Sequence, residues 1–316
     1  MKAYFRLLLI ALVLLCSTSM MSAREGPLMP GKWPAGVKVT PPDRTNTGIE
    51  VAGGWPSSRR QVVGLRFYQK GQLSACSGLL VSKKFVLTAA HCTCGDRDFD
   101  ITNSPFSEDR WVHGKFVSRF GNYDCNAYPP RGDDLALVVI DKEIDLFLNS
   151  AREPICGSYG LLSDIKRAGD FYPNFPRRVT VAGYGFEGDE ESSIGLQRET
   201  IVDVNSFACA DPIARHFMCK PFKEFVAGAV PTDGMVRDTC AGDSGGPAFA
   251  VVEGNLIPVG IVSRALPVQQ FFPRHGDCGS GGIYTLIGRI DVLEWMRKSG
   301  VSEGGTDPDC APPVMK

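Results

Sequence analysis

The stretch DTCAGDSGGP, residues 238–247, contains a serine that could act as a nucleophile. Ser244 stands between an aspartate and two glycines, and Asp238 lies six residues upstream. A serine hydroxyl attacks efficiently when an imidazole accepts its proton and a buried carboxylate holds that imidazole in the useful tautomer. Gly, Asp and Ser are also ordinary turn formers, so this run alone is equally consistent with a plain loop.

Two other segments supply the imidazole and the carboxylate. TAAHC, residues 88–92, places His91 just after a predicted strand, and DDLALVVI, residues 133–140, places Asp133 and Asp134 at the head of another. A lone histidine is usually structural, and an acidic pair can simply mark a solvated strand start. The three segments together, in the order His, Asp, Ser, predict nucleophilic catalysis. Glycine at 242 would let the amides of Gly242 and Ser244 point at one developing oxyanion.

The elements that must position these residues are mostly strands. Short apolar runs such as QVVGLRF, KKFVLTAA, LALVVI, RRVTVAGYG, PAFAVV and LIPVGIVS are separated by Gly, Pro, Asp and Asn. Their spacing predicts an all-β sandwich or barrel. Near the end, RIDVLEWMRKSG has apolar residues at helical spacing, basic residues in its last turn and a glycine stop, which predicts one short amphipathic helix.

The N-terminus and the cysteines indicate export. Residues 1–23 have two basic residues, an apolar run and small residues at the end, which is typical of a secretory signal peptide and too short to span a bilayer. Residues 24–50 are rich in proline, which is typical of a flexible pro-segment or linker. Ten of the 11 cysteines follow the signal, and disulfides are the default in an oxidising compartment. We expect a secreted protein, extracellular or periplasmic.

Composition argues against other classes of partner. The formal net charge is -1, so neither nucleic acid nor a membrane surface is indicated. The HCTC run at residues 91–94 could suggest a metal site, but it lacks a second His/Cys pair at zinc spacing, so we expect disulfides and no metal.

At this point the chain resembles the trypsin/chymotrypsin family of serine endopeptidases over about residues 51–298. TAAHC, DLAL and GDSGGP match the three motifs of that family, with CSGLLV at Cys76 and GYG at Gly183 as secondary matches. The resemblance implies a protease domain at 51–300 of two antiparallel six-stranded β-barrels, about 51–165 and 166–288. A short C-terminal α-helix and a tail at 301–316 follow, the site lies between the barrels, and no cofactor is needed.

The resemblance also implies roles for individual residues. His91 is the general base, Ser244 the nucleophile, and Asp134 the orienting carboxylate, preferred to Asp133 because it directly precedes Leu-Ala-Leu. Gly242 and Ser244 form the oxyanion hole. The function implied is hydrolysis of polypeptides through an acyl-enzyme, with protein inhibitors of proteases as further partners. The alternative is a catalytically inactive protease-like binding protein, against which the complete set of three residues counts.

Substrate preference follows from the same resemblance. Asp238 corresponds to the floor of the primary specificity pocket, where a buried carboxylate favours cleavage after Arg or Lys. Thr239 adds a hydroxyl, Gly282 keeps the wall open, and Ser263 supports Asp134 and pairs with substrate backbone. An ordinary loop aspartate is the alternative for Asp238. The chain departs from the family at residues 264–265, where Arg-Ala replaces the usual Trp-Gly and the alanine narrows the pocket mouth.

Activation and disulfides complete the expectations. Family members are zymogens, and here the best match to the mature start is VAGG, so cleavage between Glu50 and Val51 would free an amino group for Asp243. Ile49 is the alternative terminus. The family pairs are Cys76 with Cys92, Cys209 with Cys219, and Cys240 with Cys278; elimination leaves Cys94 with Cys125 and Cys156 with Cys310.

Overall fold

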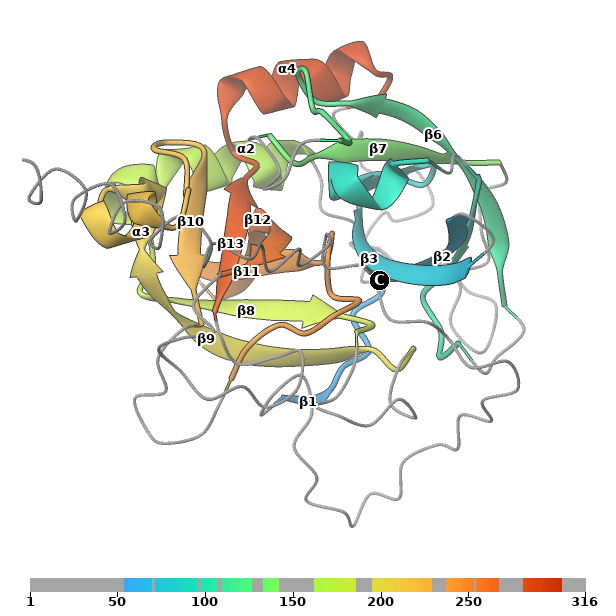
Figure 1. Cartoon of the computed structure of the whole chain (residues 1–316), viewed down its shortest axis with the longest axis horizontal. Coiled ribbons are helices and arrows are strands. Elements are labelled where there is room, and N and C mark those ends of the chain that lie inside the picture. The colour runs from blue at the N-terminus through green and yellow to red at the C-terminus, as the bar shows by residue number, and fades with distance from the viewer. Residues whose placement is uncertain are drawn as a thin grey trace, which may run out of the picture.

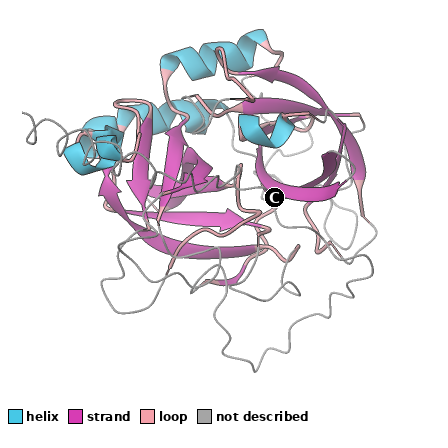
Figure 2. Cartoon of the chain, viewed as in Figure 1, coloured by secondary structure: helices cyan, strands magenta, loops and turns pink. Residues whose placement is uncertain are grey.

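The computed structural model describes residues 54–69, 72–95, 98–106, 110–126, 133–141, 162–185, 195–228, 237–252, 254–266 and 281–302. Two β-barrels lie side by side, the first at the right and the second at the left of Figure 1. Figure 2 shows that strands make up most of the ordered elements. The predicted signal peptide, the pro-segment and residues 303–316 lie outside the described residues.

The first barrel closes in the order β2-β3-β4-β7-β6-β5, with every pair antiparallel. Its strands are β2 (Val62–Gln69), β3 (Gln72–Leu80), β4 (Phe85–Thr88), β5 (Asp98–Thr102), β6 (Val112–Arg119) and β7 (Ala136–Ile140). Val63, Leu65, Phe99, Ile101 and Val138 fill its interior. Closure leaves no unpaired edge in this barrel.

The second barrel closes in the order β8-β9-β10-β13-β12-β11, because β8 pairs with both β9 and β11. Its strands are β8 (Arg178–Gly183), β9 (Arg198–Ser206), β10 (Glu224–Ala227), β11 (Pro247–Val252), β12 (Asn255–Ala265) and β13 (Gly282–Leu286). The two-residue strand β1 (Trp55–Pro56) pairs with β9 from outside this ring. The prediction of two antiparallel six-stranded barrels is confirmed.

The helices are few. The predicted C-terminal helix is α4 (Ile290–Lys298), and it returns from the second barrel to cover the first (Figure 1). There Trp295 Nε1 donates to Ser118 Oγ at 3.1 Å, and its ring lies 5.3 Å from that of Phe120. The sequence patterns did not predict α2 (Leu162–Asp170), α3 (Pro212–His216) or the 3₁₀ turns η1 (Ala90–Thr93), η3 (Tyr172–Asn174) and η5 (Phe207–Cys209).

A shared core joins the barrels. Leu79 and Leu135 of the first barrel region belong to the same buried cluster as Tyr184, Phe249 and Ile261 of the second. Tyr184 and Phe249 are fully buried, and burying such a side chain contributes on the order of 2–3 kcal/mol. The junction between the barrels is therefore a continuous part of the buried core.

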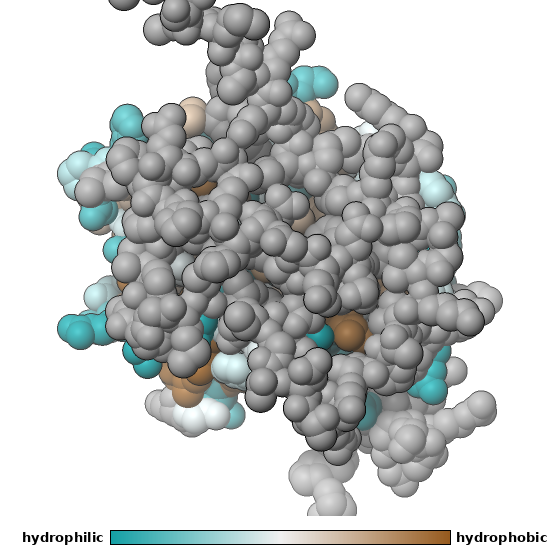
Figure 3. Space-filling model, turned by 60° about the horizontal axis from the view of Figure 1, so that its bottom comes forward, coloured by the Kyte–Doolittle hydropathy of each residue, from teal (hydrophilic) through white to brown (hydrophobic). Residues whose placement is uncertain are grey.

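The described surface is mixed in character. On the face in Figure 3, hydrophilic and hydrophobic described side chains are interspersed. Most exposed large hydrophobic residues come from different elements, among them Tyr68, Phe222, Val251 and Ile290. Single exposed hydrophobic residues are normal on a folded protein. Within the described ranges, no helix combines the length and apolar character needed to cross a membrane.

Candidate active site

Strand pairing brings His91 to Asp134. Strand β4 ends at Thr88, which pairs with Ala136 at the start of β7. His91 follows three residues after Thr88, in η1, and Asp134 precedes Ala136 by two residues. The Asp134 Oδ2 atom lies 2.8 Å from His91 Nδ1, and Oδ1 accepts the backbone N–H of His91 at 2.9 Å. Of the two adjacent aspartates, it is Asp134 that contacts the imidazole.

Asp134 is fully buried, and its carboxylate has a third donor. Ser263 Oγ, near the end of β12, donates to Asp134 Oδ2 at 2.7 Å. Burial alone would raise the pKa of this carboxyl, but the His91 imidazole and the hydrogen bonds from His91 and Ser263 outweigh it and lower the pKa. An ionised carboxylate can only accept, so it fixes the proton of His91 on Nδ1 and leaves Nε2 as the acceptor.

Asp133, the other candidate, has a different environment. Its Oδ2 accepts from Lys223 Nζ at 2.7 Å and its Oδ1 from Arg289 Nη1 at 2.9 Å. Both partners belong to the second-barrel half of the chain, just before β10 and α4. Asp133 therefore ties the loop that carries Asp134 to the second barrel.

Ser244 lies at the junction of the two barrels. Its carbonyl accepts from Ser77 N of β3 at 2.8 Å. The Cys92 sulfur lies 3.7 Å from His91 Nε2 and 3.8 Å from Ser244 O, so the imidazole and Ser244 border the same atom. Ser244 and His91 are both described residues, and no hydrogen bond joins Ser244 Oγ to His91 Nε2. In enzymes such a hydrogen bond is often long without substrate and shortens only when substrate binds.

Two glycines allow this approach. A Cβ on Gly245 would lie 2.1 Å from Thr88 Oγ1 and 2.3 Å from Ser77 O, so only glycine lets this turn pack against the first barrel. Gly242 has φ +94°, a conformation that side-chain-bearing residues rarely adopt. Within the described part of the chain, the backbone N–H groups of Gly242 and Ser244 have no protein acceptor.

Asp243 is a buried carboxylate beside this turn. Its Oδ1 accepts from Gly185 N at 2.9 Å and its Oδ2 from Cys240 N at 2.8 Å. Burial raises its pKa to about 6, and the two backbone hydrogen bonds offset this only in part. No cation among the described residues pairs with it. Val51, its predicted partner, lies outside the described residues.

The predicted pocket residues also come together. Asp238 is buried and accepts from Thr239 N at 2.8 Å and from Gly281 N at 2.6 Å. A Cβ on Gly282 would lie 3.3 Å from Thr239 Oγ1. A Cβ on Gly228 would lie 2.7 Å from Asp238 Oδ1, so the absence of a side chain there leaves room for this carboxylate.

Three of the predicted disulfides lie within the described residues: Cys76–Cys92, Cys94–Cys125 and Cys209–Cys219. Cys240 is also disulfide-bonded. Cys278, Cys156 and Cys310 lie outside the described residues. The Cys76–Cys92 bond joins β3 to the turn that carries His91, so it fixes that turn on the first barrel.

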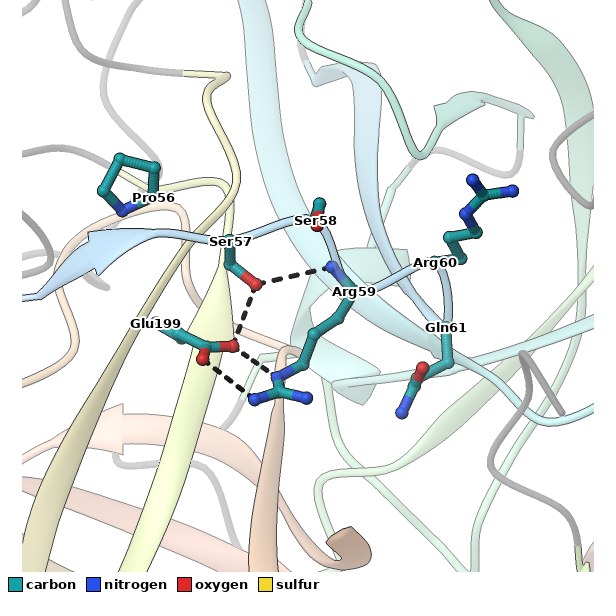
Figure 4. A pocket seen from close by; sticks show the side chains of 7 residues that line it. All are labelled: Pro56, Ser57, Ser58, Arg59, Arg60, Gln61 and Glu199. Atoms are coloured by element: carbon teal, nitrogen blue, oxygen red, sulfur yellow. Dashed lines mark hydrogen bonds and ion pairs between the residues drawn. The ribbon is translucent and has the colours of Figure 1, made fainter. Parts of the chain in front are cut away.

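A surface pocket of about 390 Å³ lies elsewhere, where residues 56–61 pass over β9. Figure 4 shows Ser57 and Arg59 directed at Glu199. Trp55 Nε1 donates to the same carboxylate at 3.0 Å. None of the predicted site residues lines this pocket, and its ion pair serves to fix the segment after β1.

Sequence reasoning missed several neighbours of the site. Glu224 reaches it from β10, Gly228 from just after β10 and Tyr284 from β13, and nothing in their own sequence context signals this. Tyr123 does so from the turn after β6; burial and the nearby Asp134 raise the pKa of its hydroxyl. The sequence marks Arg264 only as a departure from the family pattern. Its partner Glu224 lies 40 residues away, so the pair cannot be read from the sequence.

Comparisons with known proteins agree with one another. The family model described as Trypsin matches residues 52–292. Trypsin from Phaedon cochleariae is 30% identical over 266 residues, which cover 82% of this chain and 92% of that protein. Vitamin K-dependent protein C from Mus musculus is 26% identical over 238 residues, 73% of this chain; the chain spans about half of that longer protein, 47%. Phenoloxidase-activating factor 3 from Holotrichia diomphalia is 24% identical over 292 residues, which cover 82% of this chain and 76% of that protein.

Proposed function

Because this chain belongs to the trypsin family of serine proteases, we propose that it is a secreted endopeptidase that cleaves through an acyl-enzyme on Ser244. The observation that carries the proposal is the contact of 2.8 Å between His91 Nδ1 and the buried Asp134. It leaves His91 Nε2 free to accept a proton on the side of Ser244.

The reaction follows from these groups. His91 Nε2 accepts the Ser244 proton while Oγ attacks the carbonyl carbon of the peptide bond. The N–H groups of Gly242 and Ser244 donate hydrogen bonds to the carbonyl oxygen and stabilise the negative charge that develops on it. The imidazolium then donates its proton to the leaving amine, and water, deprotonated by the same imidazole, hydrolyses the ester. Asp134 stabilises the imidazolium without taking its proton.

Labelling tests this proposal against the rival, an inactive protease-like binding protein. The processed protein should react with a fluorophosphonate at Ser244, and Ser244→Ala should abolish labelling and lower turnover by on the order of 10⁶. Binding of peptides without labelling, in a folded and processed sample, would favour the rival.

We propose cleavage after Arg or Lys. The support is the buried Asp238, whose carboxylate lies beside Thr239, Gly282 and Gly228. A guanidinium or ammonium group in this pocket compensates the carboxylate, whereas an uncharged side chain does not. On a peptide library Asp238→Ser should lower the Arg/Lys preference by about 3–5 kcal/mol, or more than a hundredfold. Dominant cleavage after aromatic or small residues would reject this pocket and leave the protease proposal intact.

We also propose that the chain is a zymogen activated by cleavage between Glu50 and Val51. Asp243, buried beside the oxyanion turn, would receive the new amino group. Pro56 of β1 pairs with Arg198 of β9, and Arg198 pairs in turn with Gly183 of β8. Gly183 lies next to Asp243 Oδ1, so Pro56 is two strands away from this carboxylate. Two strand spacings are about 10 Å, within reach of the five residues before Pro56. An enzyme specific for Arg or Lys cannot cut after Glu50, so another protease must do so; N-terminal sequencing of the active form tests this.

A further inference from the structure

A buried ion pair adjoins Ser263, the serine that donates to Asp134. Arg264 follows Ser263 on β12, and Glu224 is the first residue of β10. The Arg264 nitrogens Nη1 and Nη2 donate to the two Glu224 oxygens, each at 2.8 Å. Their side chains are 10% and 0% exposed. This is a bidentate pair, which restricts the orientation of both groups.

Further contacts fix the guanidinium. Arg264 Nη2 also donates to Met218 O at 2.9 Å, and Glu224 Oε2 accepts from Lys220 N at 2.9 Å. The pair is therefore held by β10, β12 and the segment that precedes β10. A guanidinium with partners on two other segments is restricted in its orientation.

The same guanidinium also contacts the oxygen of the Ser263 hydroxyl. Arg264 Nη1 lies 3.2 Å from Ser263 Oγ, which lies 2.7 Å from Asp134 Oδ2. A guanidinium only donates, and a hydroxyl has one hydrogen. Ser263 Oγ therefore accepts from Arg264 and gives its one hydrogen to Asp134, so Arg264 holds the oxygen in the position from which it donates to Asp134.

We propose that Arg264, held by Glu224, is a positioning residue that acts through Ser263 on Asp134 and thereby on the orientation of His91. The inference rests on the proposed role of His91, Asp134 and Ser244 in catalysis. Because Glu224 neutralises Arg264, the pair orients the hydroxyl without adding net positive charge near the imidazole.

The charges around the network predict what each variant should do. The ionisable groups around it include His91, Asp134, Tyr123 and Lys220, and next to these lie Asp133, Lys223, Arg119 and Asp124. Removing Arg264 alone leaves the buried Glu224 carboxylate without its bidentate partner and makes the surroundings of His91 and Asp134 more negative by one charge. Removing both partners leaves the net charge unchanged but still frees the Ser263 hydroxyl.

The main test is the double variant Glu224→Leu/Arg264→Met, because apolar replacement of a whole buried ion pair usually preserves folding. In the processed enzyme, kcat should fall about tenfold with little change in KM, since the orientation of about one hydrogen bond is lost. In a Ser263→Ala background the same double change should lower kcat less than twofold further. Wild-type kcat in the double variant, or a full tenfold loss in the Ser263→Ala background, would overturn the proposal.

Two comparisons separate positioning from stability. Arg264→Met alone should move the acidic limb of the kcat/KM profile to higher pH. Arg66→Met, which removes an arginine from the Arg66–Asp100 pair of the first barrel (2.9 Å), should leave kcat and the pH profile unchanged. A pH profile that Arg264→Met leaves unmoved would contradict the charge argument.

A second readout does not depend on turnover. The proton on His91 Nδ1, hydrogen-bonded to Asp134, should give a downfield NMR resonance in Ser244→Ala. That resonance should shift or broaden when Glu224→Leu/Arg264→Met is added, and an unchanged resonance would contradict the inference. If the wild-type protein neither labels nor turns over, the proposed function fails, while this resonance still tests the positioning role.

Discussion

Titration of Asp243 should make the unprocessed chain less stable as the pH rises. Its carboxyl is buried, and its pKa is raised from 3.8 to about 6 because burial outweighs two backbone hydrogen bonds. A pKa that is higher in the folded than in the unfolded chain means that the folded state binds the proton more tightly. The resulting stability is fully present below pH 3.8 and is lost as the pH rises through 6.

The size of the effect follows from the shift. A rise from 3.8 to about 6 corresponds to about 3 kcal/mol, of which about 2.4 kcal/mol should be lost between pH 4 and pH 7. Asp133 and Asp134 have lowered pKa values and therefore act in the opposite direction. Only a comparison with a variant that lacks the Asp243 carboxyl isolates its contribution.

Asp243→Asn in a Ser244→Ala background provides that comparison. The free energy of unfolding is measured for the Ser244→Ala chain with and without Asp243→Asn, at several pH values. The difference between the two chains should fall by about 2.4 kcal/mol from pH 4 to pH 7, whatever constant cost the asparagine adds. After cleavage at Glu50-Val51, the new amino group should pair with Asp243 and remove this fall. No fall in the unprocessed chain would refute the raised pKa, and the same fall after cleavage would refute the pairing.

Two further predictions concern the site and the junction between the barrels. Asp134→Asn should lower kcat by about 10⁴ in the processed enzyme, because the amide no longer holds His91 in the required tautomer; a loss below tenfold would contradict the assigned role. Gly245→Ala should lower the melting temperature far more than Gly254→Ala, because both glycines have similar φ (84° and 79°) but an added Cβ meets Thr88 at 2.1 Å in the first and nothing within 4 Å in the second. Equal effects in a thermal unfolding assay would show that the close approach at Gly245 is not limiting.

The sequence alone was enough for part of the local structure of this protein. The apolar runs predicted β4, β7, β8, β11 and most of β2 and β12, because a buried strand leaves an apolar pattern that can be read without the fold. The C-terminal helix was predicted from its apolar spacing and glycine stop. The motifs around His91, Asp134 and Ser244 were likewise recognisable, because each is a short run of contiguous residues.

Only the tertiary structure decided what these residues touch. The motif favours Asp134 over Asp133, but the contact itself comes from the strand register between β4 and β7, which brings Asp134 to His91. The Arg264–Glu224 pair joins residues 40 positions apart. The Asp243 carboxylate accepts one backbone hydrogen bond from Gly185, 58 residues away, and another from Cys240, three residues away. Hydrogen bonds and desolvation depend on distances between atoms on different strands. Those distances are set by barrel closure, which the order of residues along the chain does not reveal.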